Sequence, residues 1–187
     1  MTITGILDKY YFIMRAARFP NLDTDLKESF RHNLPFDGEG GYRETKTIQC
    51  RAECGGAQAG RNGDTIEVLH SGKSERIRLG GIDCPEKGQV YGHKAKEAAS
   101  ALVFRKEVVL QIHGKGRYRR TLADVLLLDG THVNHELAKH GWCWWYRKYA
   151  AGNAELEKLE SEAREAQRGL WADPHPVPPW EWRRRGR

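Results

Sequence analysis

Two short segments with alternating hydrophobic side chains, separated by a turn, limit the fold of this chain more than any other feature. Ile66 and Val68 share one face of residues 65–70, as they would in a half-buried strand. Residues 75–82 alternate in the same way, and Gly72 lies in the turn between the two segments. The pattern therefore predicts a β-hairpin with one buried face.

Further strands and helices are expected after this hairpin. The expected strands cover residues 107–113 and 121–128, and the expected helices cover residues 93–105, 133–140 and 153–168. The strand at 121–128 is almost wholly apolar, which is typical of a central strand. Short strands followed by a helical half predict an α+β domain built on a small barrel.

Charge and hydropathy limit the class of partner. The 187 residues carry a formal net charge of +6, and the positive excess lies after residue 45. A basic domain favours a polyanionic partner such as nucleic acid. No apolar run approaches the roughly 18–20 residues that a membrane span needs, so we expect no membrane partner. Nothing in the pattern requires a dimer, and we expect a monomer.

Both ends of the chain differ from the domain between them. Residues 1–45 show no sustained period, and we expect a poorly ordered extension there, a domain at 46–172 and a separate tail at 173–187. The N-terminus does not resemble a secretory signal peptide, so the chain as written is expected to stay inside the cell. The tail contains four prolines and cannot continue the preceding helix. Its two tryptophans, Trp180 and Trp182, are expected to pack against the domain.

The four cysteines give no clear signal. They are too few and too scattered to suggest a disulfide framework. Cys50 and Cys54 are four residues apart, but no second pair at zinc-ligand spacing follows them, so a structural zinc site is disfavoured.

Two aspartates lie at the ends of the predicted hairpin strands. Asp64 precedes the first strand and Asp83 ends the second. A hairpin brings these ends together, which would place two carboxylates on one side of the barrel. Carboxylates with nearby backbone carbonyls are hard oxygen donors of the kind that Ca²⁺ prefers. The positions therefore indicate a calcium site.

Other charged residues near these aspartates suit phosphodiester hydrolysis. Arg78 lies on the polar side of its strand, Glu86 follows Pro85, and residues 117–120 form a basic segment with a tyrosine. A phosphodiester is anionic and repels hydroxide, so its hydrolysis needs a metal ion or arginines to neutralise it and a carboxylate to handle water. Each of these residues alone is more often an ordinary turn or surface group, and the hypothesis depends on their joint spacing.

Three separated motifs, in the same order, resemble the staphylococcal nuclease (thermonuclease) family. They are Asn62-Gly63-Asp64-Thr65, Arg78-Leu79-Gly80-Gly81-Ile82-Asp83-Cys84-Pro85-Glu86 and Arg120-Thr121-Leu122-Ala123-Asp124-Val125. Further similarity extends through Val133–Leu137, Trp145–Tyr149 and Arg168–Trp171, so the resemblance covers about residues 62–172. It implies an α+β fold, a five-stranded OB-type β-barrel with three α-helices.

The resemblance also implies a calcium-dependent endonuclease that cuts DNA and RNA and leaves 3′-phosphate ends. Arg78 and Arg120 would stabilise the transition state and Glu86 would be the general base. Asp64 and Asp83 would bind Ca²⁺ through their side chains and Cys84 through its backbone carbonyl, which makes the Cys side chain irrelevant to the metal.

Two departures from the family pattern are visible. Arg119 stands where the family commonly has a glycine, directly before Arg120. Residues 55–61 are poor in β-forming residues, whereas residues 47–52 alternate. We therefore expect the first barrel strand at 47–52, with a loop inserted after it.

Aromatic and basic residues are concentrated near the predicted site. Tyr118, Arg119, Tyr146 and Tyr149 are expected to contact nucleic acid, preferably single-stranded, by stacking on bases and by hydrogen bonds to phosphate. The tryptophans of residues 142–145 are assigned mainly to the core. The alternative function is a catalytically inactive nuclease-like module that only binds nucleic acid.

Overall fold

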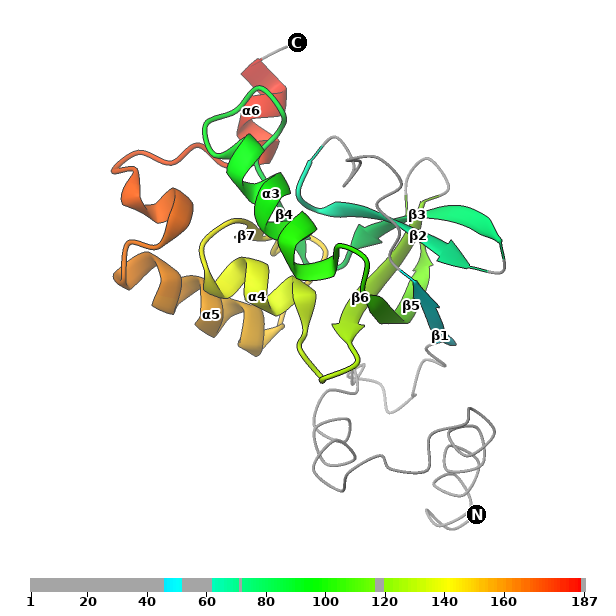
Figure 1. Cartoon of the computed structure of the whole chain (residues 1–187). Coiled ribbons are helices and arrows are strands. Elements are labelled where there is room, and N and C mark those ends of the chain that lie inside the picture. Colours follow the sequence, from blue (N-terminus) through cyan, green and yellow to red (C-terminus); the bar gives the residue numbers. More distant parts are fainter. Residues whose placement is uncertain (1–45, 52–61, 71, 117–119, 186–187) are drawn as a thin grey trace. The chain divides into compact units, whose positions relative to one another are not determined.

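The computed structural model describes residues 46–51, 62–70, 72–116 and 120–185 (Figure 1). All of them belong to one compact unit of the chain. The predictions for residues 1–45, including the poorly ordered extension, and for Tyr118 and Arg119 lie outside the described residues.

Five strands form the framework that carries the site. They are β1 (Lys46–Arg51), β2 (Thr65–His70), β3 (Lys73–Leu79), β5 (Glu107–Lys115) and β6 (Thr121–Leu127). The strand order β1-β2-β3-β6-β5 closes a barrel, in which β3 and β6 are parallel and the other pairs antiparallel. β1 occupies the segment expected for the first strand, and the predicted hairpin is β2–β3.

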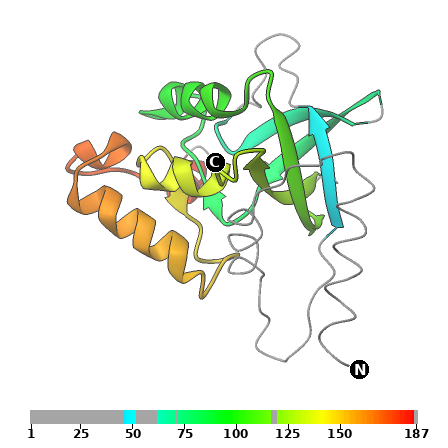
Figure 2. The same cartoon turned by 60° about the horizontal axis from the view of Figure 1, so that its bottom comes forward.

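The helices form a layer beside the barrel (Figure 2). The described residues contain α3 (Gly92–Val103), α4 (Val133–Lys139), α5 (Ala154–Glu165), the 3₁₀ turn η2 (Gly169–Ala172) and α6 (Pro179–Arg185). The α+β class is therefore confirmed, but the expected number of three helices is wrong for this part of the chain. α6 is the additional helix, and it starts at Pro179 because a proline in the first turn of a helix loses no hydrogen bond.

A two-stranded sheet of β4 (Ile82–Asp83) and β7 (Trp144–Trp145) connects the barrel to the helices. Opposite β7, the buried carboxylate of Glu160 on α5 accepts a hydrogen bond from the backbone N–H of Trp145 at 3.0 Å. Ile82 and Trp145 are both buried in the main core. This sheet fixes the position of Asp83 relative to the helical layer.

The core fills the barrel and the space beneath the helices. It contains Ile66, Val68, Ile77, Leu79, Val108, Leu110, Val125, Ala95, Ala99 and Leu137. These residues lie on the apolar faces of the predicted strands and helices. The hydrophobic periodicity of the sequence therefore agrees with the burial of the side chains. Asn134 of α4 is buried among them and donates a hydrogen bond to the Gly80 carbonyl at 2.9 Å, which holds α4 to the barrel just after β3.

The tryptophans mostly support the fold. Trp144 and Trp145 are buried, which confirms their assignment to the core. Trp180 of the tail stacks on Tyr146 with ring centroids 5.3 Å apart and packs edge-on against Trp144. The packing prediction is therefore confirmed for Trp180, whereas Trp182 is 38% exposed.

No helix in the described ranges is both long and apolar enough to cross a membrane.

Candidate active site

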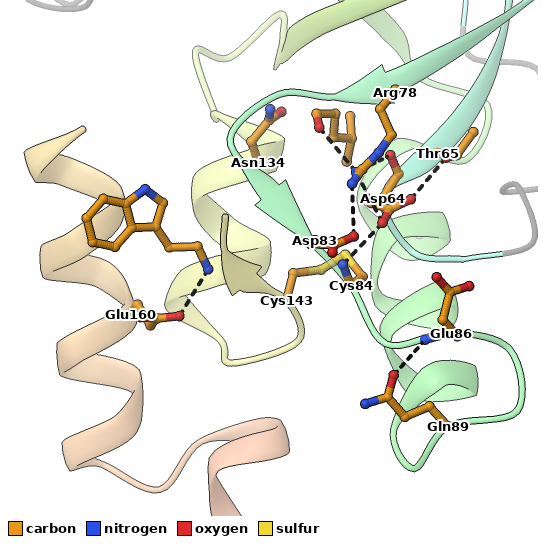
Figure 3. The surroundings of a disulfide bond; sticks show 12 residues. Asp64, Thr65, Arg78, Asp83, Cys84, Glu86, Gln89, Asn134, Cys143 and Glu160 are labelled. Atoms are coloured by element: carbon orange, nitrogen blue, oxygen red, sulfur yellow. Dashed lines mark hydrogen bonds and ion pairs between the residues drawn. A yellow bond between two sulfur atoms is a disulfide. The ribbon is translucent and has the colours of Figure 1, made fainter. Parts of the chain in front are cut away.

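Arg78 joins the two aspartates predicted as metal ligands (Figure 3). Its Nη1 lies 3.1 Å from Oδ2 of Asp64 and its Nη2 lies 3.0 Å from Oδ1 of Asp83. The hairpin register explains this arrangement, since Thr65 pairs with Arg78 and places Asp64 beside it. A turn at Gly81, with φ of +70°, then brings Asp83 back to the same place.

Both aspartates are almost completely buried. Asp64 and Asp83 are 3% and 1% exposed. Asp64 accepts hydrogen bonds from the Thr65 hydroxyl at 3.0 Å and from the Cys84 backbone N–H at 3.1 Å. Burial raises the pKa of Asp83 to about 6, although its hydrogen bond to Arg183 and the charge of Arg78 favour the carboxylate. Any cation that reaches a buried carboxylate of this kind stabilises its charged form.

Cys84 is joined to Cys143 by a disulfide bond. The sequence did not indicate this bond, because the two cysteines are 59 residues apart and no local pattern relates them. The bond ties the residue after Asp83 to the segment that enters β7 (Figure 3). With the sulfur in this bond, the backbone carbonyl is the group of Cys84 that could bind a metal.

Glu86 lies close to the aspartates in the loop that leads to α3, and both of its oxygens have partners. Nδ2 of Asn62 donates to Oε2 at 2.6 Å, and Nη1 of Arg183 donates to Oε1 at 2.7 Å. The loop ends at Gly92, which packs so closely against the Glu86 carbonyl that a Cβ would overlap it. Sequence reasoning missed Asn62 as a partner, although it belongs to the quoted Asn-Gly-Asp-Thr motif, and it missed Arg183 altogether.

The backbone of Arg120 lies beside the strand that carries Arg78. It directly precedes β6, which pairs in parallel with β3, so that Leu122 faces Arg78 in the register. The Arg120 carbonyl accepts a hydrogen bond from the Gly116 N–H at 2.7 Å. The strand pairing therefore brings the second predicted arginine to the strand that carries Arg78.

Of the predicted tyrosines, Tyr146 lines a groove beside β7. The backbone N–H of Tyr146 donates to the Gly81 carbonyl at 2.8 Å, two residues from Asp83. Tyr149 is 63% exposed and packs edge-on against Tyr146 at 4.9 Å. The groove has a volume of about 350 Å³. Its lining includes Trp144, Tyr146, Arg147, Lys148, Trp180 and Arg184.

The donor set fits a hard cation. In the described part of the chain, no group of three or more His, Cys, Asp or Glu side chains could hold a metal ion. The predicted metal ligands are the side chains of Asp64 and Asp83 and the main-chain oxygen of Cys84. All three are oxygen donors, which suits Ca²⁺, since it takes 6–8 oxygens and accepts water and substrate oxygens among them.

Comparisons with known proteins show which family this chain resembles. Residues 76–173 match the family model described as staphylococcal nuclease homologue. The chain is 44% identical over 124 residues to an uncharacterized endonuclease of Escherichia coli O157:H7, covering 66% of this chain and 80% of that protein. It is 39% identical over 132 residues to the micrococcal nuclease of Shigella flexneri, covering 66% of this chain and 76% of that protein. An uncharacterized endonuclease of Haemophilus influenzae is 43% identical over 124 residues, with 66% and 68% covered.

Proposed function

Because the chain belongs to the staphylococcal nuclease family, we propose that it is a calcium-dependent endonuclease that hydrolyses phosphodiester bonds. Two of the relatives it matches are named endonucleases and another micrococcal nuclease. The observation that carries the proposal is one cluster containing three carboxylates, Asp64, Asp83 and Glu86, together with Arg78. Trp144, the strand partner of Asp83, lines an aromatic and basic groove.

Asp64, Asp83 and the Cys84 carbonyl would hold the metal. When bound, Ca²⁺ supplies positive charge against the phosphate oxygens. The two side chains are already held for this task, because Arg78 and the Cys84 N–H keep Asp64 in place and Arg78 orients Asp83. The two carboxylates themselves therefore need little rearrangement when the cation arrives.

Glu86 orients the attacking water and accepts its proton. Asn62 fixes Oε2 at 2.6 Å, so the carboxylate is held from a side that is independent of the metal ligands. Arg78 and Arg120 neutralise the charge that develops on the phosphorus oxygens, where the planar guanidinium can bind two oxygens at once. The 5′ oxygen leaves, and the product carries a 3′-phosphate.

The substrate is DNA, with RNA as a second substrate, and single strands are preferred. The groove beside Tyr146 supports this choice, because it combines aromatic rings with Arg147, Lys148 and Arg184. Tyr118, Arg119 and Tyr149 would contact the same strand. One chain contains all the proposed groups, so the enzyme would act as a monomer.

The experiment is cleavage of denatured DNA by the purified full chain, with Ca²⁺ and with a calcium chelator in excess. We expect cleavage that requires Ca²⁺ and fragments whose 5′-hydroxyl ends accept phosphate from a kinase without prior phosphatase treatment. Fragments with 5′-phosphate ends would contradict the proposed cleavage direction. DNA binding without cleavage would favour the inactive binding module.

A further inference from the structure

Arg183 of α6 reaches two carboxylates of the site from the far end of the chain. Its Nη2 lies 2.6 Å from Oδ2 of Asp83, and its Nη1 lies 2.7 Å from Oε1 of Glu86. Nη1 also lies 3.4 Å from Oδ1 of Asp83. The guanidinium thus bridges a predicted metal ligand and the predicted general base. Arg183 is about 100 residues away from both of them in sequence.

The packing of the tail places Arg183 there. Trp180, one turn earlier in α6, stacks on Tyr146 with an interplanar angle of 5°. The side-chain amide of Gln89 donates a hydrogen bond to the Val177 carbonyl, which fixes the chain just before the helix. The side chain of Arg183 is itself 40% exposed, so it can rotate away while α6 stays docked.

The two arginines divide the oxygens of Asp83 between them. Arg78 binds Oδ1 at 3.0 Å, and the short contact of Arg183 is to Oδ2. Oδ2 is therefore the oxygen that Arg78 leaves open to a cation, and Arg183 occupies it.

We propose that Arg183 is a residue of the active site that sets its affinity for the metal, because its guanidinium competes with Ca²⁺ for Oδ2 of Asp83. This inference rests on the proposed calcium site. Binding of the cation moves the guanidinium off Asp83, while its contact with Oε1 of Glu86 can remain. Arg183 then acts as a positioning residue for Glu86, opposite Asn62.

Competition between Arg183 and Ca²⁺ predicts the direction in which the affinity for Ca²⁺ changes when Arg183 is replaced. Arg183→Gln removes both the competing hydrogen bonds and a positive charge next to the cation, so Ca²⁺ should bind more tightly. A charge-assisted hydrogen bond from a partly exposed side chain corresponds to roughly a three- to tenfold change in the dissociation constant. If Arg183 merely supported the structure of the site, its loss would loosen the carboxylates and weaken Ca²⁺ binding.

The experiment is calorimetric titration of the full chain with CaCl₂, without nucleic acid. It compares the wild type, Arg183→Gln, Arg183→Lys and Arg185→Gln. Arg185 is exposed on the same helix, and its replacement removes the same charge at a distance from the site. We expect tighter binding for Arg183→Gln, a smaller gain for Arg183→Lys, which keeps the charge, and nearly wild-type binding for Arg185→Gln.

The outcomes separate this inference from the proposed function. Equal dissociation constants for wild type and Arg183→Gln, weaker binding by Arg183→Gln, or an equal gain in Arg185→Gln would overturn the inference alone. Absence of Ca²⁺ binding by the wild type would contradict both. Near-ultraviolet circular dichroism of the variants, dominated by tryptophans such as Trp180, shows whether α6 stays docked.

Discussion

Reduction of the Cys84–Cys143 disulfide should destabilise the domain strongly. The bond connects residues 59 apart, and a cross-link that closes a loop of this length restricts the unfolded chain by about 4 kcal/mol in the chain-entropy description. Both cysteines are completely buried, so the reduced thiols gain no contact with water in the folded state. The expected free energy of unfolding of the reduced protein is therefore lower by about this amount.

Urea unfolding followed by tryptophan fluorescence measures this difference. The protein should carry Cys50→Ser and Cys54→Ser, so that Cys84 and Cys143 are its only cysteines. With a denaturant slope of about 2 kcal/mol per molar, the midpoint of the reduced protein should lie about 2 M below that of the oxidised protein. Ca²⁺ binding should weaken as well, because the bond holds the residue next to Asp83.

The control variant replaces Cys84 and Cys143 with alanine in the same background. Its midpoint should not respond to a reducing agent. If oxidised and reduced protein unfolded at the same urea concentration, the disulfide would not cross-link the folded chain, and the account of how β4 is held beside β7 would be refuted.

Three further predictions concern other parts of the molecule. Burial, and then the nearby His135, lower the pKa of His132 to about 4, so the unfolded state takes up the proton first and stability is lost as the pH falls from 6.5 to 4. The loss approaches about 3 kcal/mol at pH 4, and His132→Gln should remove this part of the pH dependence in urea unfolding. Arg78→Gln should lower the cleavage rate by about 10²–10³-fold, as expected for one lost charge-stabilising group, with circular dichroism as the check on folding. Gly141→Ala should cost at least about 2 kcal/mol, because Gly141 has φ of +68° and a Cβ would overlap the Arg168 carbonyl; a melting temperature within a few degrees of the wild type would contradict this.

Local patterns were sufficient to predict the framework of the site. The alternation in residues 65–70 matches β2, and the helices at 133–140 and 153–168 agree with α4 and α5 to within a few residues at each end. Asp64 and Asp83 were placed together because strand ends in a hairpin meet. The structure brings them to within hydrogen-bonding distance of the same arginine.

What the sequence could not predict depends on contacts between distant segments. β4 and β7 have two residues each, which is too short for any period to show. The contacts of Arg183 and the pairing of Cys84 with Cys143 arise only after the tail and β7 have packed. The prolines of the tail correctly predict that it does not continue α5, but they do not indicate that Pro179 starts a separate helix, α6.

Glu86→Gln tests the central claim most directly, that this cluster of carboxylates and Arg78 is the active site of a nuclease. The measurement is the initial rate of cleavage of denatured DNA at saturating Ca²⁺, with Glu97→Gln as the matched control. Glu97 is an exposed carboxylate on α3, with a side chain 64% accessible. A general base contributes about 10²–10⁴-fold, so we predict a loss of at least about 100-fold for Glu86→Gln and a nearly wild-type rate for the control. A Glu86→Gln enzyme that cleaves at close to the wild-type rate would contradict the account.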